Sequence, residues 1–261
     1  MSVALPVVLL VPGAWTVPKA YHKLVSALEA KSFNVQVLAL PTNNDQRPTN
    51  ATCDADMQAV RKAVQPLVDS GREVIMLMHS YGGIPGTSGI RNFTRKDRQA
   101  MDQPGGVVGL IYTAGFMLCE GQSIRTVVQA VNLPGRSSLV KFNSDNCTWF
   151  PIDPIWLLYH DLAPADQEEQ AKLLRWSNAA ILTQQTTYAG WKDVPTLYIR
   201  SSKDRWLPPD FQDYCLENAG DAGASVRVAT LNSGHSPYVN FAAELAQMTF
   251  EAAISVRTRL L

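Results

Sequence analysis

The sequence predicts an α/β protein built on about six mostly parallel strands that are flanked by helices. Short runs rich in Val, Ile and Leu alternate along the chain with longer stretches of helical periodicity, a pattern typical of β-α-β units. The chain has 261 residues, of which 46% are hydrophobic and 18% charged, enough apolar material for one large core. The alternation stops between residues 116 and 191, which indicates an insertion into this core.

Six runs have the length and composition of strands whose two faces are both covered by helices. They are Val7 to Val11, Val35 to Ala39, Glu73 to Met78, Val107 to Thr113, Thr196 to Arg200 and Val226 to Leu231. We therefore expect six buried strands.

Apolar residues recur at helical spacing in three stretches that follow or precede these runs. The stretches are Lys19 to Lys31, Asp54 to Ser70 and Tyr238 to Val256. Their apolar stripes are expected to face the core.

The segment 116–191 is far longer than an ordinary connection and holds several helix-like stretches. We expect it to form a helical cap, or lid, over a core domain made of residues 1–115 and 192–261. Its aromatic residues either wall an apolar ligand pocket or pack against one another, and the sequence does not decide between the two. They are Trp149, Phe150, Trp156, Tyr159, Trp176, Tyr188 and Trp191.

Charge and cysteine content exclude several classes of function. Lys+Arg and Asp+Glu both number 23, so no net field draws the protein to nucleic acid or to an anionic membrane. No run approaches the roughly 18 apolar residues of a membrane span, and the N-terminal run lacks a charged leader, so a cytoplasmic protein is expected. The four cysteines show no metal or dithiol spacing. We expect them to be free, buried thiols, and we expect no metal and no cofactor.

A candidate nucleophile follows the third predicted strand, in Met78-His79-Ser80-Tyr81-Gly82-Gly83. Ser80 lies where a strand must turn sharply into a helix, which is the geometry of a nucleophile elbow. Gly82 gives the small residue that the turn needs on one side, whereas Met78 breaks the strict G-x-S-x-G pattern on the other.

A serine hydroxyl needs a base and a carboxylate to become nucleophilic, and both follow later in the chain. Asp204 comes just after the fifth predicted strand and His235 just after the sixth. Each lies at the carboxyl end of a strand, the edge where open α/β sheets place their sites. The sequence therefore predicts a catalytic triad of Ser80, Asp204 and His235.

Other residues fit these roles less well. His79 adjoins Ser80 in a strand, so its ring should point away from the serine hydroxyl and pack in the core. The remaining candidates do not follow a strand directly; they are His22 and His160 for the base, and Asp193, Asp210 and Asp213 for the carboxylate.

Acyl transfer also needs N–H donors for the negative charge that develops on the carbonyl oxygen. We expect the backbone N–H groups of Tyr81 and Ala14 to form this oxyanion hole, the latter because it follows the first strand and Pro12 has no N–H. Trp15, Tyr81 and Trp206 are expected to contact the substrate.

These motifs resemble the α/β-hydrolase superfamily over nearly the whole chain. Val11-Pro12-Gly13-Ala14-Trp15 is similar to the H-G-A-W oxyanion loop of the branch that holds methylesterases and hydroxynitrile lyases. The resemblance implies an α/β-hydrolase fold with an inserted cap. Two residues depart from that branch: Pro12 stands where the oxyanion loop usually has His, and Met78 where the elbow usually has Gly. The Thr and Lys typical of the hydroxynitrile lyases are replaced by Gly13 and Ser236, so ester hydrolysis is favoured over cyanohydrin cleavage.

The sequence thus predicts a serine hydrolase that cleaves a carboxylic ester or lactone of a small, apolar or aromatic substrate. Two alternatives stay open: a non-hydrolytic enzyme that uses the same site for C–C cleavage, decarboxylation, cyclisation or elimination, and a small-molecule receptor. The expected partner is a small-molecule substrate, and a homodimer is left open.

Overall fold

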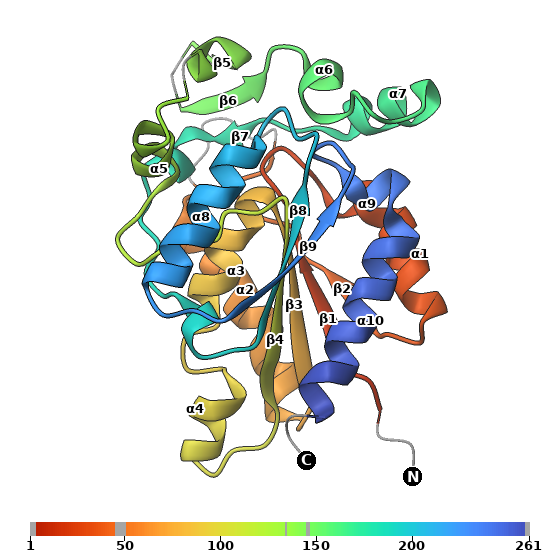
Figure 1. Ribbon diagram of the computed structural model, residues 1–261, viewed down its shortest axis with the longest axis vertical. Helices are drawn as coiled ribbons and strands as arrows, with labels where there is room; N and C mark the ends of the chain where they lie inside the picture. Colours follow the sequence, from red (N-terminus) through yellow and green to blue (C-terminus); the bar gives the residue numbers. More distant parts are fainter. Residues whose placement is uncertain (1–3, 45–50, 134, 145–146, 259–261) are drawn as a thin grey trace.

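Six parallel strands form the central sheet of the computed structural model, which describes residues 4–44, 51–133, 135–144 and 147–258 (Figure 1). The strand order is β2-β1-β3-β4-β8-β9, and each neighbouring pair is parallel. The strands are β1 (Val7–Val11), β2 (Val35–Val37), β3 (Glu73–His79), β4 (Gly106–Thr113), β8 (Thr196–Ser201) and β9 (Val226–Leu231). The predicted fold class is confirmed.

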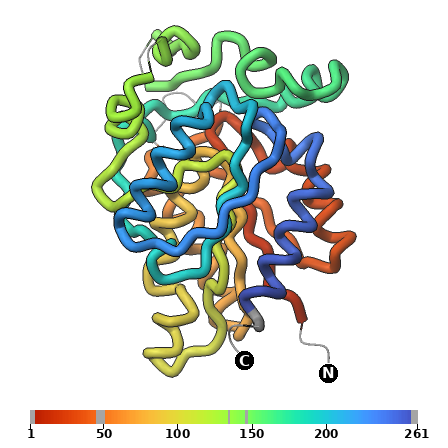
Figure 2. Tube along the Cα trace, in the orientation of Figure 1, coloured from red at the N-terminus to blue at the C-terminus, as the bar shows by residue number. Residues whose placement is uncertain are grey.

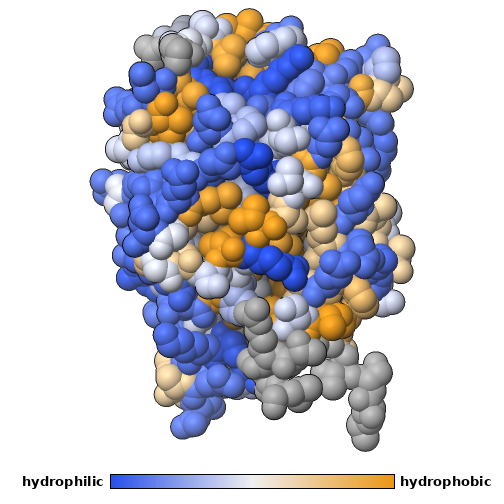
Figure 3. Space-filling model, viewed as in Figure 1, coloured by the Kyte–Doolittle hydropathy of each residue, from blue (hydrophilic) through white to orange (hydrophobic). Residues whose placement is uncertain are grey.

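The expectation that all six strands are buried is wrong for the two at the edges. β1 and β4 are buried along their whole length, whereas β2 is only half-buried and β9 exposes several side chains. An edge strand has a neighbour on one side only, and Val228 of β9 is 48% exposed. Beside β9, apolar side chains gather near the centre of the face drawn in Figure 3, where a cavity of about 200 Å³ lies between the sheet and the C-terminal helix.

Helices cover both faces of the sheet (Figure 1). One face carries η1 (Pro18–Tyr21), α1 (His22–Ala30), α9 (Pro237–Asn240) and α10 (Ala242–Thr258), and the other α2 (Cys53–Asp69), α3 (Gly83–Gly89) and α8 (Pro209–Asp221). The short α4 (Arg95–Ala100) begins after Thr94, whose side chain accepts a hydrogen bond from the backbone N–H of Asp97. The three predicted helices are present, although the first opens with a 3₁₀ turn and the last is interrupted at Phe241.

The segment between β4 and β8 passes over the carboxyl ends of the strands and returns (Figure 2). It contains the expected helices but also a three-stranded antiparallel sheet, β5-β6-β7, which the sequence analysis did not anticipate. Its elements are α5 (Ile124–Ala130), η3 (Arg136–Leu139), β5 (Val140–Phe142), β6 (Thr148–Pro151), α6 (Pro154–Leu158), α7 (Pro164–Leu173), β7 (Ser177–Asn178), η4 (Ala179–Leu182) and η5 (Gly190–Lys192). We refer to residues 116–191 as the cap segment; its assignment as a separate domain stays a prediction.

Within the described residues, no helix has both the length and the apolar character needed to cross a bilayer. The four cysteines are free, as expected, but only Cys53 and Cys215 are buried. Cys119 is half-buried and Cys147 is exposed, so the expectation of burial is wrong for these two.

Candidate active site

Ser80 lies at the sharp turn between β3 and the helical pair η2 (Ser80–Gly82) and α3, with a φ of +52°. This left-handed conformation is unfavourable for a residue with a side chain and marks a strained turn. Gly82 is required here because a Cβ atom at its position would collide with the carbonyl oxygen of Val11. The backbone of Ser80 is fixed further by its carbonyl oxygen, which accepts a hydrogen bond from the N–H of Phe116 at 3.0 Å.

Met78 stands where the elbow motif usually has glycine, and the structure shows how its side chain fits. A Cβ atom on Gly86 of α3 would lie 2.6 Å from the sulfur of Met78, so the missing side chain on the helix makes room for the thioether. The hydroxyl of Thr87 also contacts this sulfur at 3.7 Å. The departure from the motif is therefore compensated within the adjoining helix.

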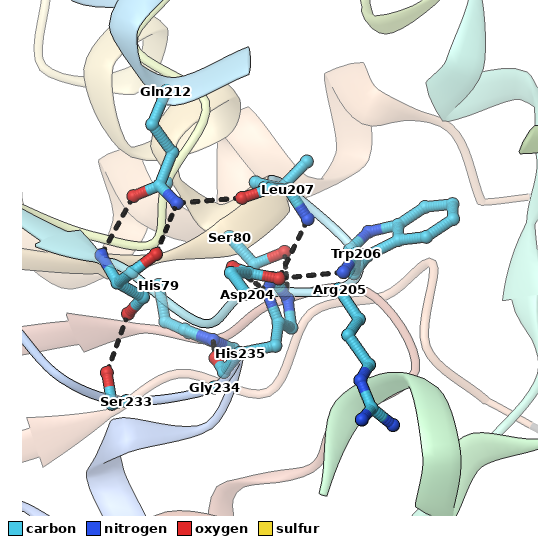
Figure 4. Close-up of polar contacts among 12 residues, drawn as sticks. His79, Ser80, Asp204, Arg205, Trp206, Leu207, Gln212, Ser233, Gly234 and His235 are labelled. Atoms are coloured by element: carbon cyan, nitrogen blue, oxygen red, sulfur yellow. Dashed lines mark hydrogen bonds and ion pairs between the residues drawn. The ribbon is translucent and has the colours of Figure 1, made fainter. Parts of the chain in front are cut away.

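The three side chains predicted as a triad form one chain of hydrogen bonds (Figure 4). Nδ1 of His235 donates to Oδ2 of Asp204 at 2.7 Å. A neutral imidazole that donates through Nδ1 accepts at Nε2, which lies 3.0 Å from Oγ of Ser80. The other carboxylate oxygen of Asp204 accepts two backbone N–H bonds, from Trp206 and Leu207, each at 2.8 Å. All three side chains are buried.

The loops that carry Asp204 and His235 are braced by two residues that the sequence analysis missed. The Gln212 side chain on α8 bonds both backbone polar groups of Ser201 and the carbonyl of Leu207 (Figure 4). Asp161 of the cap segment accepts the backbone N–H of Gly234 at 2.6 Å. Gln212 thus ties the end of β8 to the loop beyond Asp204, and Asp161 ties the loop before His235 to the cap segment. No local pattern in the sequence reveals these bonds.

His79 points away from the serine hydroxyl, as the strand alternation predicts. Its Nε2 donates to the backbone carbonyl of His235 at 2.8 Å, and its Nδ1 accepts from the Tyr21 hydroxyl at 2.8 Å. Burial lowers the pKa of His79 well below its usual value, and His235 lowers it further, so the ring is neutral. The Tyr21 hydroxyl in turn accepts the N–H of Gly13 at 2.9 Å.

Ala14 lies in a loop whose neighbouring N–H groups are already engaged. Gly13 donates to Tyr21, and Trp15, in a left-handed conformation with φ of +66°, donates to Oδ1 of Asn43 at 3.0 Å. Within the described part of the chain, no hydrogen bond is made by the Ala14 N–H. The loop runs against the nucleophile, since a Cβ atom on Gly13 would lie 2.9 Å from Cβ of Ser80.

Tyr81 supplies the other expected donor and follows Ser80 directly, in the first turn of η2. Its N–H belongs to the group of helix-terminal donors that have no partner within the helix. The Tyr81 side chain, however, turns into the core, where its hydroxyl donates to Oδ2 of Asp56 at 2.7 Å. The Tyr81 ring is therefore buried with its hydroxyl on Asp56, and a contact between this ring and the substrate stays a prediction.

Trp15 and Trp206 pack with Trp149 of the cap segment in one aromatic cluster, with ring centroids 4.4 to 5.8 Å apart. Trp149 and Trp206 also line an apolar cavity of about 240 Å³ between the core and the cap segment. The other lining residues come from both parts. Most are apolar, among them Phe116, Ile124, Val128, Leu133, Leu182, Leu207 and Phe211, and four are polar: Arg125, Gln129, Arg136 and Ser137. Trp15 and Tyr81 are not among them.

In the described ranges, no group of three or more His, Cys, Asp or Glu side chains has the arrangement of a metal site.

With this geometry in hand, the chain can be compared with known proteins. A model of the alpha/beta hydrolase family matches residues 8–248. The chain belongs to this family. Two fungal relatives match at low identity. A protein described as a probable hydrolase from a Phoma species is 27% identical over 95% of this chain and 98% of the relative. An alpha/beta hydrolase from Aspergillus novofumigatus is 25% identical over 89% of this chain and 90% of the relative.

Solved structures of this hydrolase family share the fold at still lower identity. A pyrethroid hydrolase from Sphingobium faniae superimposes with a TM-score of 0.71 and 19% identity, covering 95% of this chain and 97% of the neighbour. A methylesterase from Arabidopsis gives a TM-score of 0.70 and 19% identity over 95% and 98%.

Proposed function

We propose that this α/β-hydrolase is a serine hydrolase that cleaves a carboxylic ester or lactone through an acyl-enzyme on Ser80. The observation that carries the proposal is the chain of hydrogen bonds from Ser80 through His235 to Asp204. Three side chains from three strand ends reach the distances that proton transfer needs, and the order Ser, Asp, His along the chain is that of the fold family.

In the first half of the reaction, Oγ of Ser80 attacks the carbonyl carbon while Nε2 of His235 takes the hydroxyl proton. The tetrahedral intermediate then collapses, the bond to the leaving oxygen breaks, and His235 returns the proton to that oxygen. Asp204 holds the imidazole in the tautomer that accepts at Nε2 and stabilises the imidazolium. The two backbone N–H bonds hold the Asp204 carboxylate in place, so it need not reorganise during the proton transfer.

In the second half, His235 takes a proton from water, and the resulting hydroxide equivalent attacks the acyl carbon. The bond to Oγ breaks, the carboxylic acid leaves, and the proton returns to Ser80. The proposed proton transfers use side chains and water alone.

The N–H groups of Ala14 and Tyr81 are proposed to stabilise the oxyanion in both intermediates. Support comes from the Gly13–Trp15 loop, which lies against Ser80 and leaves the Ala14 N–H without an internal acceptor in the described residues. Preorganised donors of this kind typically contribute about 3 to 4 kcal/mol each to the activation barrier.

The substrate class we propose is a small ester or lactone with an apolar or aromatic portion. The cavity of about 240 Å³ between core and cap segment is walled mainly by apolar side chains, and Trp206, two residues beyond Asp204, contributes to its wall. The relatives that act on a pyrethroid or a methyl ester, by their descriptions, are consistent with this class. A cytoplasmic location and the homodimer remain predictions.

The decisive variant is Ser80→Ala, assayed with a p-nitrophenyl ester. We expect kcat to fall by about 10⁴-fold or more, because no other group on the enzyme replaces the nucleophile. Ser88→Ala, which removes another buried hydroxyl near the elbow, is the matched control and should stay within a few-fold of wild type.

Labelling with a fluorophosphonate, followed by mass spectrometry, gives a second readout. The reagent should add to Ser80 in the wild type and in Ser88→Ala, and not in Ser80→Ala. Turnover by Ser80→Ala at the wild-type rate, or labelling at another serine, would overturn the proposal.

A further inference from the structure

Asp56 is a buried carboxylate that the proposed reaction does not use. It lies in the first turn of α2, is 0% exposed, and accepts three hydrogen bonds. Oδ1 accepts the backbone N–H of Thr42 at 3.0 Å; Oδ2 accepts the Thr42 hydroxyl at 2.6 Å and the Tyr81 hydroxyl at 2.7 Å. Burying a charged group is costly, so such a carboxylate needs a structural or functional reason.

One of these bonds leads directly to the elbow. Tyr81 follows Ser80, and its N–H is one of the two proposed oxyanion donors. Its ring is 1% exposed, and the hydroxyl at the far end of the ring is tied to Asp56. A side chain held at both ends leaves the backbone of its residue little freedom to rotate, so the direction of the Tyr81 N–H depends on this bond.

The other two bonds lead to the second donor. Thr42 precedes Asn43, whose amide nitrogen donates to the Gly13 carbonyl at 2.8 Å and whose oxygen accepts the Trp15 N–H at 3.0 Å. The Gly13 carbonyl and the Ala14 N–H belong to one planar peptide group and point in opposite directions. Fixing the carbonyl with Asn43 therefore fixes the direction in which the Ala14 N–H points.

We propose that Asp56 is a positioning residue that aligns both donors of the oxyanion hole, Tyr81 through its hydroxyl and Ala14 through Thr42 and Asn43. The inference rests on the proposed function, because it concerns how an acyl-transfer site is preorganised. It assigns to helix α2 a part in the chemistry although no residue of α2 lines the cavity between core and cap segment.

The ionised form of Asp56 suits this role. Three donors already point at the carboxylate, and the Thr42 N–H on Oδ1 cannot reverse its direction. A proton added to Oδ2 could be accepted only by the Thr42 or Tyr81 hydroxyl, which would first have to give up its own bond to Asp56. Burial raises the pKa of Asp56 to about 6, although the bonds from Thr42 and Tyr81 lower it. The titratable side chains near Asp56 are Tyr81 and Cys53, and burial raises the pKa of each. The charge of Asp54 also raises the pKa of Cys53.

The test compares Asp56→Asn and Tyr81→Phe with wild type on the same p-nitrophenyl ester. Asp56→Asn puts an NH₂ donor among the groups that donate to Asp56, and we expect kcat to fall about 10- to 100-fold while KM changes less than about 3-fold. Tyr81→Phe removes only the hydroxyl bond and should lower kcat about 3- to 10-fold. Tyr112→Phe, which removes a buried hydroxyl bond to Thr87 away from Asp56, is the matched control and should keep wild-type kcat.

The pH profile separates positioning from mere loss of stability. In the wild type, Asp56 must lose a proton for full kcat, whereas Asp56→Asn has no carboxyl at this position. On the acid side, the slope of log kcat against pH should therefore be steeper in the wild type than in Asp56→Asn, by up to one proton. Equal slopes and an unchanged kcat in Asp56→Asn would overturn the inference.

Two further results keep the outcomes distinguishable. If Ser80→Ala abolishes turnover while Asp56→Asn retains the wild-type kcat and slope, the inference fails and the proposed function stands. If Ser80→Ala retains turnover, the proposed function itself fails. Should Asp56→Asn not fold, as judged by circular dichroism, Tyr81→Phe decides: a wild-type kcat in that variant contradicts the inference.

Discussion

The two sides of the proposed reaction centre are built differently. On the nucleophile side, the loops carrying Ser80, His235 and Asp204 are held by buried polar contacts at 2.6 to 3.0 Å, from Gln212 among others. On the proposed substrate side, the cavity below the cap segment is bounded mainly by apolar and aromatic side chains. Hydrogen bonds fix direction, whereas apolar contacts fix only shape and volume. Damage to the first region should therefore reduce the rate for every substrate, and changes in the second should alter which substrate is preferred.

The largest effect that sharpens this contrast is expected from Asp204→Asn. The amide oxygen keeps the two backbone N–H bonds, so the NH₂ group faces Nδ1 of His235 and donates to it, and the imidazole loses the tautomer that accepts from Ser80. We expect kcat to fall about 10³- to 10⁴-fold for short and long esters alike. A loss confined to one ester would contradict the division into the two regions. Asp221→Asn, on the exposed end of α8, should leave kcat unchanged.

The buried Asp56 should make stability and activity respond to pH in opposite directions. Its folded-state pKa of about 6 lies above the ordinary value of 3.8, so between these values the folded protein keeps a proton that the unfolded chain has released. Stability is therefore present at acid pH and is lost as the pH rises through about 6, by up to about 3 kcal/mol between pH 4 and pH 7.

Urea unfolding of wild type and Asp56→Asn across this range measures that effect. The difference between the two unfolding free energies should change with pH in the stated direction. A difference that stays constant from pH 4 to pH 7 would show that Asp56 does not titrate as described.

On the apolar side, Val128→Phe should narrow the cavity from α5 without touching the polar network. We expect kcat/KM for a long-chain p-nitrophenyl ester to fall about 10-fold relative to the acetate ester, because one lost or added hydrophobic contact of this size is worth about 1 to 3 kcal/mol. The acetate ester is the internal control. An equal loss for both esters would mean that the cavity does not hold the acyl chain.

The smallest effect is expected where the cap segment is tied to the His235 loop, at Asp161. Its carboxylate accepts from Gly234, next to His235, and from the Asn240 side chain at 3.2 Å. Asp161→Ala removes this link, and we expect kcat to fall about 3- to 10-fold as the His235 loop gains freedom. Hydrogen exchange should rise in residues 232–240 and in the cap segment near residue 161; unchanged exchange in both would contradict a bracing role.

Much of the core could be predicted from the sequence because its signals are local. Runs such as Val7–Val11 and the turn at Ser80 follow from residue type and spacing alone, and these elements lie where expected. The burial of β9 could not be predicted, because an apolar run does not reveal whether a strand has one neighbour or two. The β5-β6-β7 sheet was missed since its strands have two to four residues and are stabilised by pairing between distant segments.

The same limit applies to the site. Ser80, Asp204 and His235 could be selected because each follows a strand, and the structure brings them together. Asp56 and Asp161 carry no such mark: Asp56 looks like an ordinary acidic residue in the first turn of a helix, and its bond to Tyr81 spans 25 residues. The direction of the Tyr81 ring could not be predicted from the sequence, because it depends on that distant partner.

The pairing of Met78 with Gly86 implies that these two positions change together. Replacing Met78 by glycine alone would leave an empty space beneath the elbow, and replacing Gly86 by alanine alone would force two side chains into one volume. The double replacement moves the bulk from strand to helix and should be tolerated better than either single one. The turn has room for one side chain, which can come from either the strand or the helix. A glycine at the motif's first position is therefore one of two ways to avoid a steric clash there.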